Sequence, residues 1–227
     1  LLWAARQAYP EIMFAVSQLC SVMSAPSQIA WNAGLRVLKW LYNHRDKGIQ
    51  YHSNCALEPI LYYDSSHNLY DDSKGHYGFQ INMCDGPVIY ESKKHAKIGA
   101  DSSGSEYMAL FYGTKSVVKL RNLITQLQSY PKPIEPTICL GDNDNATRAA
   151  RGDCPGEFAK TLRLKFDWSK EQVDDQQITT ARIGTADNVS DIYTKPVKTG
   201  VWRALYLKAK GYESPWRPDS ETATQHQ

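Results

Sequence analysis

The stretch ICLGDNDNAT, residues 138–147, is an apolar run that ends abruptly on the carboxylate of Asp142. Asn143 and Asp144, two further side chains able to bind a cation or cap a helix, follow directly. An Asp between a strand and a helix is a preferred N-cap residue, because its oxygen accepts hydrogen bonds from free backbone N–H groups. Taken alone, the stretch favours this capping role for Asp142 over a place in a functional site.

Composition describes an ordinary globular protein: 227 residues, 42% hydrophobic and 22% charged, enough for one large domain or a domain with a helical appendage. The five Cys residues are scattered, which predicts reduced thiols and an intracellular protein of unknown compartment. No apolar run is as long as a membrane span and no secretory signal is present, so we expect no membrane partner. Because the first residue is Leu, we expect a fragment, a processed product or an incompletely known sequence.

Charge is unevenly distributed although the net charge is only +2. Basic residues gather at 36–47 and 195–210, whereas acidic residues gather at 64–72 and 142–157. Basic flanks around an acidic centre fit a polyanion that is held beside a cation site. Solvated helix faces would account equally well for either basic segment alone.

The first 50 residues have helical periodicity and predict a helical hairpin, broken by Ser24–Ser27. Two helices alone bury little surface, so the hairpin must dock on this domain or on another chain. The second helix places one set of apolar residues on its expected buried stripe, namely Ile29, Trp31, Leu35, Leu38 and Leu41.

Residues 51–212 predict an α/β domain built around one mixed five-stranded sheet flanked by helices. The expected strands lie within 56–67, 76–83, 86–94, 137–140 and 177–184. The expected helices lie within 103–127, 143–151, 158–173, 187–196 and 199–211. A polar tail, 213–227, should be loose unless a partner protein holds it.

Four acids lie in or beside these elements, and each has an ordinary structural explanation. Asp64 lies in the first strand, where a turn former would also fit. Glu106 completes a capping box with Ser103 at the start of the long helix. Asp142 and Asp191 could both be N-caps. Considered singly, these structural roles are favoured.

Together the motifs resemble a known family. The ordered series ILYYDSS, SKK, SSGSEYMAL, ICLGDNDNA and DNVSDIYTKP is similar to the ribonuclease H domain of copia-type retrotransposon polyproteins. Upstream, YPEIMFAVSQLCSVMSAPSQIAWNAGLRVLKWL resembles the segment that joins reverse transcriptase to ribonuclease H in the same polyproteins. The resemblance covers residues from about 1 to about 212.

The resemblance implies a ribonuclease H-like fold whose sheet carries the carboxylates of Asp64, Glu106, Asp142 and Asp191 as catalytic metal ligands. In-line cleavage of a phosphodiester uses two ions about 3.5–4 Å apart, and Mg²⁺, or Mn²⁺ in its place, prefers such oxygen ligands. On this reading Asp64 bridges both ions, Glu106 and Asp142 bind the first, and Asp191 binds the second. Asn143 would support the site or start a helix.

The resemblance also implies the substrate, which is RNA within an RNA–DNA hybrid, or RNA itself. Minor-groove shape and the 2′-hydroxyl would distinguish the RNA strand. Lys93, Lys94 and Lys195 would hold phosphates, and Asn143 is a further expected nucleic-acid contact. The chain departs from the family's pattern where two customary histidines fall on Thr161 and Asp167.

Two hypotheses therefore remain: a metal-dependent endonuclease, and a domesticated copy of weak or no activity that serves as a structural subunit of a larger, RNA-containing assembly. The retained acids favour the first, and the lost histidines favour the second. Other protein chains would then hold the N-terminal helices and the tail. A zinc protein, a Ser/His/Asp hydrolase and an aspartic protease all lack their required motifs.

Overall fold

The computed structural model describes residues 1–53, 58–96, 102–127, 135–144, 152 and 160–214. Its centre is one five-stranded sheet in the order β3-β2-β1-β4-β5. The first three strands are antiparallel neighbours: β1 (Ile60–Ser66), β2 (His76–Met83) and β3 (Gly86–Lys94). The last two, β4 (Thr137–Gly141) and β5 (Ile178–Arg182), run parallel to β1. The predicted mixed five-stranded sheet is confirmed.

β1 is the central strand and is buried on both faces. Leu61 and Tyr63 point into one hydrophobic cluster, and Ile60 and Tyr62 point into another on the opposite face. A strand covered on both sides reads as a nearly continuous apolar run, as ILYY does, rather than as an alternating one. β1 also carries Asp64, whose side chain is buried like those of its apolar neighbours.

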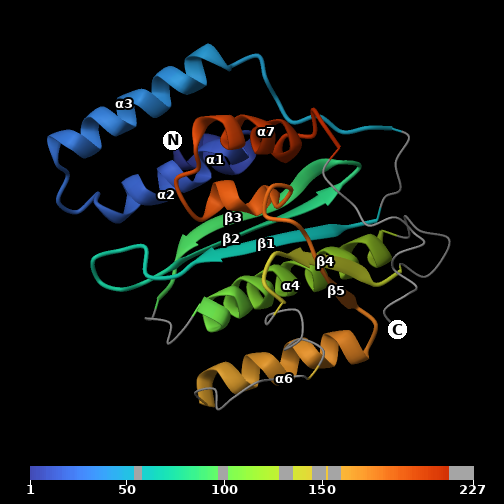
Figure 1. Ribbon diagram of the computed structural model, residues 1–227. Helices are drawn as coiled ribbons and strands as arrows, with labels where there is room; N and C mark the ends of the chain where they lie inside the picture. Colours follow the sequence, from blue (N-terminus) through green and yellow to red (C-terminus); the bar gives the residue numbers. More distant parts are fainter. Residues whose placement is uncertain (54–57, 97–101, 128–134, 145–151, 153–159, 215–227) are drawn as a thin grey trace.

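Two helices cover one face of the sheet: α4 (Ser102–Gln126) lies directly on it, and α6 (Lys160–Asp174) packs beside α4 (Figure 1). Their buried side chains join those of the strands in one cluster. Tyr107 of α4 stacks on Phe166 of α6, with ring centroids 3.6 Å apart. The long helix and the later helix that the sequence predicted are therefore both present.

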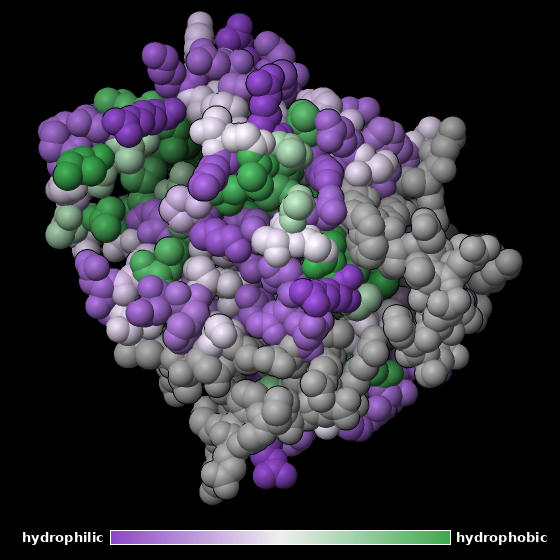
Figure 2. Space-filling model, viewed as in Figure 1, coloured by the Kyte–Doolittle hydropathy of each residue, from purple (hydrophilic) through white to green (hydrophobic). Residues whose placement is uncertain are grey.

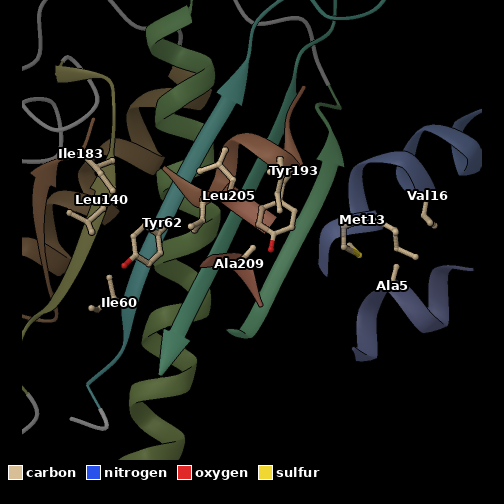
Figure 3. Close-up of a cluster of buried hydrophobic side chains, with 13 residues drawn as sticks. Ala5, Met13, Val16, Ile60, Tyr62, Leu140, Ile183, Tyr193, Leu205 and Ala209 are labelled. Carbon is tan, nitrogen blue, oxygen red and sulfur yellow. The ribbon is translucent and has the colours of Figure 1, made fainter. Parts of the chain in front are cut away.

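The opposite face is covered by elements from the two ends of the described chain. From the N-terminus come α1 (Leu2–Gln7), the 3₁₀ helix η1 (Pro10–Ile12) and α2 (Met13–Ser21), and from the C-terminal part come η2 (Val189–Tyr193), also 3₁₀, and α7 (Thr199–Ala209). Figure 3 shows Tyr193, Leu205 and Ala209 near Tyr62 of β1, and Ala5, Met13 and Val16 of the N-terminal helices belong to the same buried cluster. The N-terminal helices thus dock on this domain. The division at residue 50 stays a prediction.

The second helix of the hairpin, α3 (Gln28–Asn43), lies outermost on this side (Figure 1). Ser27 caps it, its hydroxyl accepting a hydrogen bond from the Ala30 N–H at 3.1 Å. α3 packs inward through three partly buried residues, Val37, Trp40 and Leu41.

The predicted buried stripe of α3 is wrong apart from Leu41. Four side chains expected inside are exposed: Ile29 by 82%, Trp31 by 64%, Leu35 by 47% and Leu38 by 52%. Apolar residues occupy more than one side of this helix, so periodicity alone could not choose the side that packs. Figure 2 shows apolar side chains gathered at the upper left, where α3 lies in Figure 1.

Of the remaining predicted elements, two are described by the structure, and the others fall mostly outside the described residues. The helix expected within 187–196 is only the short η2, and the one expected within 199–211 is α7. The polar tail beyond Ser214 and most of the helix expected within 143–151 fall outside the described residues. In the part of the chain that the structure describes, no helix is both long and apolar enough to cross a membrane.

Candidate metal centre

The first two acids of the site, Asp64 and Asp142, are brought together by the register of two parallel strands. Tyr62 of β1 lies opposite Leu140 of β4, so two positions further along Asp64 and Asp142 come to the same level. Asp142 directly follows the last residue of β4, at the carboxyl end of the strand. Polar side chains gather at this edge in α/β sheets because the strands end there and leave room. Asp64 is buried and Asp142 is half-buried.

The third acid, Asp191, arrives from η2. Asn188 is the N-cap of η2, since its side chain accepts the Ser190 N–H at 3.2 Å, so the predicted capping role for Asp191 is wrong. Instead, Asp191 is buried beside Asp64. Carboxylate oxygens of Asp64, Asp142 and Asp191 all lie within 4.8 Å of one another.

Close approach of η2 to the sheet makes this grouping possible. Gly78 of β2 pairs with Asp64, and a Cβ atom on Gly78 would lie only 2.4 Å from the Tyr193 Cβ atom. Thr194, the next residue, donates its hydroxyl to the Asp64 carboxylate. The glycine therefore lets η2 rest directly on the strand that carries Asp64.

The fourth acid, Glu106, comes from α4 on the other face of the sheet. Glu106 is the fifth residue of α4, which begins at Ser102, so it does not occupy the predicted capping-box position. The backbone N–H of Ser65 donates to its carboxylate, while its Oε2 atom is buried without a hydrogen-bond partner. Glu106 lines an open hollow of about 510 Å³ together with Asp142, Asn143, Asp144 and Arg182.

The structure therefore brings all four predicted acids to one end of the sheet. Burial, and then the neighbouring charge of Asp191, raise the pKa of Asp64 to about 7. Burial, followed by the charges of Asp64 and Asp142, also holds the pKa of Glu106 well above its usual range. Burial raises the pKa of Asp191 despite the opposing effect of Lys195. Crowded carboxylates of this kind are costly without a cation.

Lys195, predicted to hold phosphate, lies among the carboxylates. Its Nζ atom is 3.0 Å from Asp191 Oδ1 and 3.4 Å from Asp64 Oδ2. Burial lowers the pKa of Lys195, but the nearby carboxylates outweigh it and raise this pKa above its ordinary value.

Three residues that the sequence did not single out as part of a site contribute to it. Arg182, at the end of β5, forms an ion pair with Asp144 at 2.8 Å and lines the hollow. Thr185 donates its hydroxyl to Asp142 Oδ2 at 3.1 Å. Thr194 holds Asp64 as described above. The sequence gives no signal for Arg182 or Thr185, because only the tertiary fold places them here. Thr194 lies in the quoted motif DNVSDIYTKP, but nothing in that motif marks its bond to Asp64.

The other predicted nucleic-acid contacts differ in position. Asn143 lines the hollow, whereas Lys93 and Lys94 belong to the edge strand β3, which β2 separates from β1. The Lys94 ammonium pairs with Asp72 at 2.9 Å, and Lys93 is exposed. Neither lysine therefore joins the acidic cluster.

Histidines are absent from the residues that line the hollow within the described part of the chain. Asp167, where the family's pattern has histidine, is an exposed residue of α6. Thr161 also lies in α6, but its side chain is outside the described set. His67, just after β1, has its Nδ1 atom 3.4 Å from the hydroxyl of Ser105, the neighbour of Glu106.

The residues present fit a hard divalent cation. Mg²⁺ and Mn²⁺ prefer carboxylate oxygens, and this cluster offers oxygens from three aspartates within 4.8 Å of one another. The buried Oε2 atom of Glu106 has no hydrogen-bond partner, as expected of a ligand atom facing a cation position.

Strand order and the acidic cluster together define the class: this is a ribonuclease H-like domain, with an antiparallel β1–β3 unit extended by two parallel strands. Sequence comparison then relates the chain to the copia-type Pol polyproteins of retrotransposons, which confirms the predicted resemblance.

The Pol polyprotein of transposon RE2 from Arabidopsis thaliana is 25% identical over 189 residues, 83% of this chain and 13% of the relative. That of transposon TNT 1-94 from Nicotiana tabacum is 22% identical over 200 residues, 87% of this chain and 15% of the relative. A putative transposon Ty5-1 protein of Saccharomyces cerevisiae is 32% identical over 110 residues, 48% of this chain and 36% of the relative. The chain thus spans a small part of these Pol polyproteins. No family model matches it.

Solved structures give modest similarities. The N-terminal ribonuclease H domain of rv2228c from Mycobacterium tuberculosis is 13% identical with a TM-score of 0.46, covering 66% of this chain and 96% of that one. Ribonuclease H1 LC11, in complex with an RNA/DNA hybrid, is 15% identical with a TM-score of 0.45, covering 60% and 94%.

Proposed function

We propose that this chain is a metal-dependent ribonuclease H-type endonuclease that cleaves RNA within an RNA–DNA hybrid. The observation that carries the proposal is the convergence of Asp64, Asp142 and Asp191 within 4.8 Å, with Glu106 on the same hollow as Asp142. Surface acids repel one another and spread apart, whereas these are gathered at the carboxyl ends of two central strands. The relation to retrotransposon Pol polyproteins supports the same function.

The four acids would hold divalent ions, Mg²⁺ or Mn²⁺. Bound there, such ions supply an activated water and stabilise the leaving oxygen of an in-line phosphodiester cleavage. Asp64, Asp142 and Asp191 would hold the ions together with Glu106, which lines the same hollow as Asp142. Thr194 and Thr185 orient Asp64 and Asp142 by donating hydrogen bonds to their carboxylates.

The open, polar hollow suits a backbone phosphate. Asn143 offers an amide to a phosphate or sugar oxygen, and Arg182 a guanidinium, since both line this hollow. Lys93 and Lys94, on the far edge strand, would contact phosphates some distance from the point of cleavage. A hybrid fits best, because its minor groove exposes the 2′-hydroxyls that mark the RNA strand.

The second candidate function is that of a structural subunit that keeps the fold but has weak or no catalytic activity. It is favoured by the lack of a histidine among the described residues that line the hollow. A histidine would assist proton transfer, so its loss would be expected to slow the reaction rather than to prevent metal binding.

The test is cleavage of a labelled RNA–DNA hybrid with Mg²⁺ or Mn²⁺ by the full chain and by Asp142→Asn. Since Asp142 is half-buried and at a strand end, the variant should fold while activity falls by at least about a hundredfold. Asp174→Asn, an exposed acid of α6, is the matched control and should cleave normally. Hybrid binding without cleavage by the parent chain would support the structural subunit instead.

A further inference from the structure

The Lys195 ammonium occupies the Asp191 side of the acidic cluster. Its Nζ atom lies 3.0 Å from Asp191 Oδ1 and 3.4 Å from Asp64 Oδ2, two of the three groups that could share a metal ion. On the Glu106 side, Glu106 Oε2 is buried without a hydrogen-bond partner, and no ion pair to Glu106 is found among the described residues. Asp64 and Asp191 are therefore paired with a cation from the protein, whereas Arg182, the cation that lines the Glu106 hollow, pairs with Asp144 instead.

A divalent ion and this ammonium cannot share the same side. Mg²⁺ binds carboxylate oxygens at 2.0–2.1 Å, so an ion held by Asp64 and Asp191 would lie within a few ångströms of the Nζ atom. Two cations that close in a partly buried site repel strongly. Lys195 would have to leave before the ion could enter.

The geometry allows the side chain to leave while the backbone stays. Thr194, the preceding residue, is fixed from two directions: its hydroxyl donates to Asp64, and its carbonyl oxygen accepts the Ser66 hydroxyl at 2.9 Å. The side chain of Lys195 itself is 36% exposed, so it has a path to solvent. A lysine stem can rotate between such positions at low cost, unlike a fixed metal ligand.

We propose that Lys195 is a built-in competitor for the second divalent ion. In the free protein its ammonium neutralises Asp64 and Asp191, and the Glu106 and Asp142 side takes the first ion. Entry of a second ion on the Asp191 side displaces the ammonium, which then becomes available to a substrate phosphate. This inference rests on the proposed metal-dependent function and adds an order of loading to it.

The experiment measures Mn²⁺ binding to the full chain by calorimetry at one fixed pH, without nucleic acid. For Lys195→Met we expect the weaker of two Mn²⁺ ions to bind at least about tenfold more tightly than in the parent chain. Lys195→Arg keeps the charge and should bind like the parent. Lys198→Met is the matched control, an exposed lysine three residues away, and should also leave binding unchanged.

A second readout covers the case in which removal of the ammonium weakens the fold. Without metal, Lys195→Met should unfold at a lower temperature than the parent, since its carboxylates lose their counter-ion. Saturating Mn²⁺ should then raise its unfolding temperature more than that of the parent. Lys195→Gln, neutral but still a hydrogen-bond donor, should bind Mn²⁺ as the Met variant does.

Equal number and affinity of Mn²⁺ ions in the parent and in both neutral variants would overturn the inference. Hybrid cleavage, assayed in parallel, separates this result from failure of the proposed function. Cleavage by the parent with unaltered Mn²⁺ binding in Lys195→Met rejects only the competition. Tighter Mn²⁺ binding in Lys195→Met by a chain that never cleaves a hybrid supports the competition and rejects the endonuclease.

Discussion

Lys210 Nζ lies 3.1 Å from Glu11 Oε1, and neither side chain is exposed. The two residues are 199 positions apart, so this ion pair joins η1 to the residue that follows α7. Lys210 also donates to the Lys47 carbonyl at 2.6 Å, and the Trp40 indole N–H donates to Glu11 at 3.5 Å. The N-terminal segment is thus attached to the sheet domain by a buried charge pair as well as by apolar contacts.

Glu11→Gln should destabilise the fold by about 3–5 kcal/mol, because it leaves the Lys210 charge buried without its partner. The free energy of unfolding in urea measures this. The double variant Glu11→Gln/Lys210→Met should lose less than the sum of the two single losses, since neither group is then left as an unpaired charge.

Asp174→Asn is the control for that pair. Asp174 pairs with Lys170 at 2.6 Å on the surface of α6, where both side chains are about half exposed or more (47% and 61%). Such a pair contributes at most about 0.5 kcal/mol. A loss in Glu11→Gln as small as that of Asp174→Asn would contradict the buried pair.

Asp64 should make stability depend on pH in the absence of metal. Its folded-state pKa of about 7 lies above the ordinary 3.8, so between these values the unfolded chain binds fewer protons than the folded one. The stability that protonated Asp64 contributes to the folded state is fully present below about pH 3.8 and is lost as the pH rises through about 7. The stability advantage of the parent over Asp64→Asn should therefore shrink across this window, as measured by urea unfolding with a chelator.

The comparison with Asp64→Asn is needed because two buried histidines act in the opposite direction. Burial lowers the pKa of His76 to about 3 and that of His95 to about 4, against an ordinary 6.5. Between about pH 4 and 6.5 the two imidazoles are neutral in the folded state and take up protons on unfolding, which favours the unfolded chain. Their effect on the free energy of unfolding therefore becomes less unfavourable as the pH rises towards 6.5. An Asp64→Asn variant whose stability stays parallel to the parent at every pH would contradict the raised pKa of Asp64.

Gly78→Ala should disturb both the fold and the metal site. The added methyl group would collide with Tyr193 and push η2 away from β2. We expect a loss of about 1–3 kcal/mol in unfolding free energy. Mn²⁺ affinity should fall too, because Asp191 would move away from Asp64. Gly200→Ala, where nothing lies within 4 Å, should lower neither stability nor Mn²⁺ affinity.

Leu38→Ser should leave stability within about 0.5 kcal/mol of the parent, because Leu38 is 52% exposed on α3. Leu110→Ala, at a position of 0% exposure in α4, should cost about 2–5 kcal/mol. Thermal and urea unfolding would compare the two. A large loss for Leu38→Ser would mean that α3 packs through the face that the sequence first suggested.

The strands of the sheet could be predicted from the sequence because their apolar runs are local features of the chain. The run ILYYDSS predicts a strand that carries an acid, and the register of β1 with β4 brings Asp64 and Asp142 to one level. The resemblance predicted that four acids would gather, and strand order explains the meeting of Asp64 with Asp142, whereas Asp191 and Glu106 arrive from η2 and α4. The assignment of each acid as a metal ligand, like the division of the chain at residue 50, stays a prediction.

The sequence could not supply contacts that depend on tertiary placement. Periodicity identifies which residues of α3 share a face, but it could not show that Val37 and Trp40 face the domain while Trp31 does not. In the same way, Arg182 and Thr185 reach the site only because β5 lies next to β4. Lys195 looked like a phosphate contact, since nothing local indicated that its ammonium would lie between two carboxylates.

The bond between Glu11 and Lys210 also has a consequence for biosynthesis. A ribosome adds about 5–20 residues per second, so roughly 10–40 s separate the emergence of these two partners. During that interval the apolar side of α1 and α2 has neither η2 nor α7 to cover it. We expect this segment to be a binding site for chaperones on the nascent chain, and folding to be completed only after α7 has left the exit tunnel.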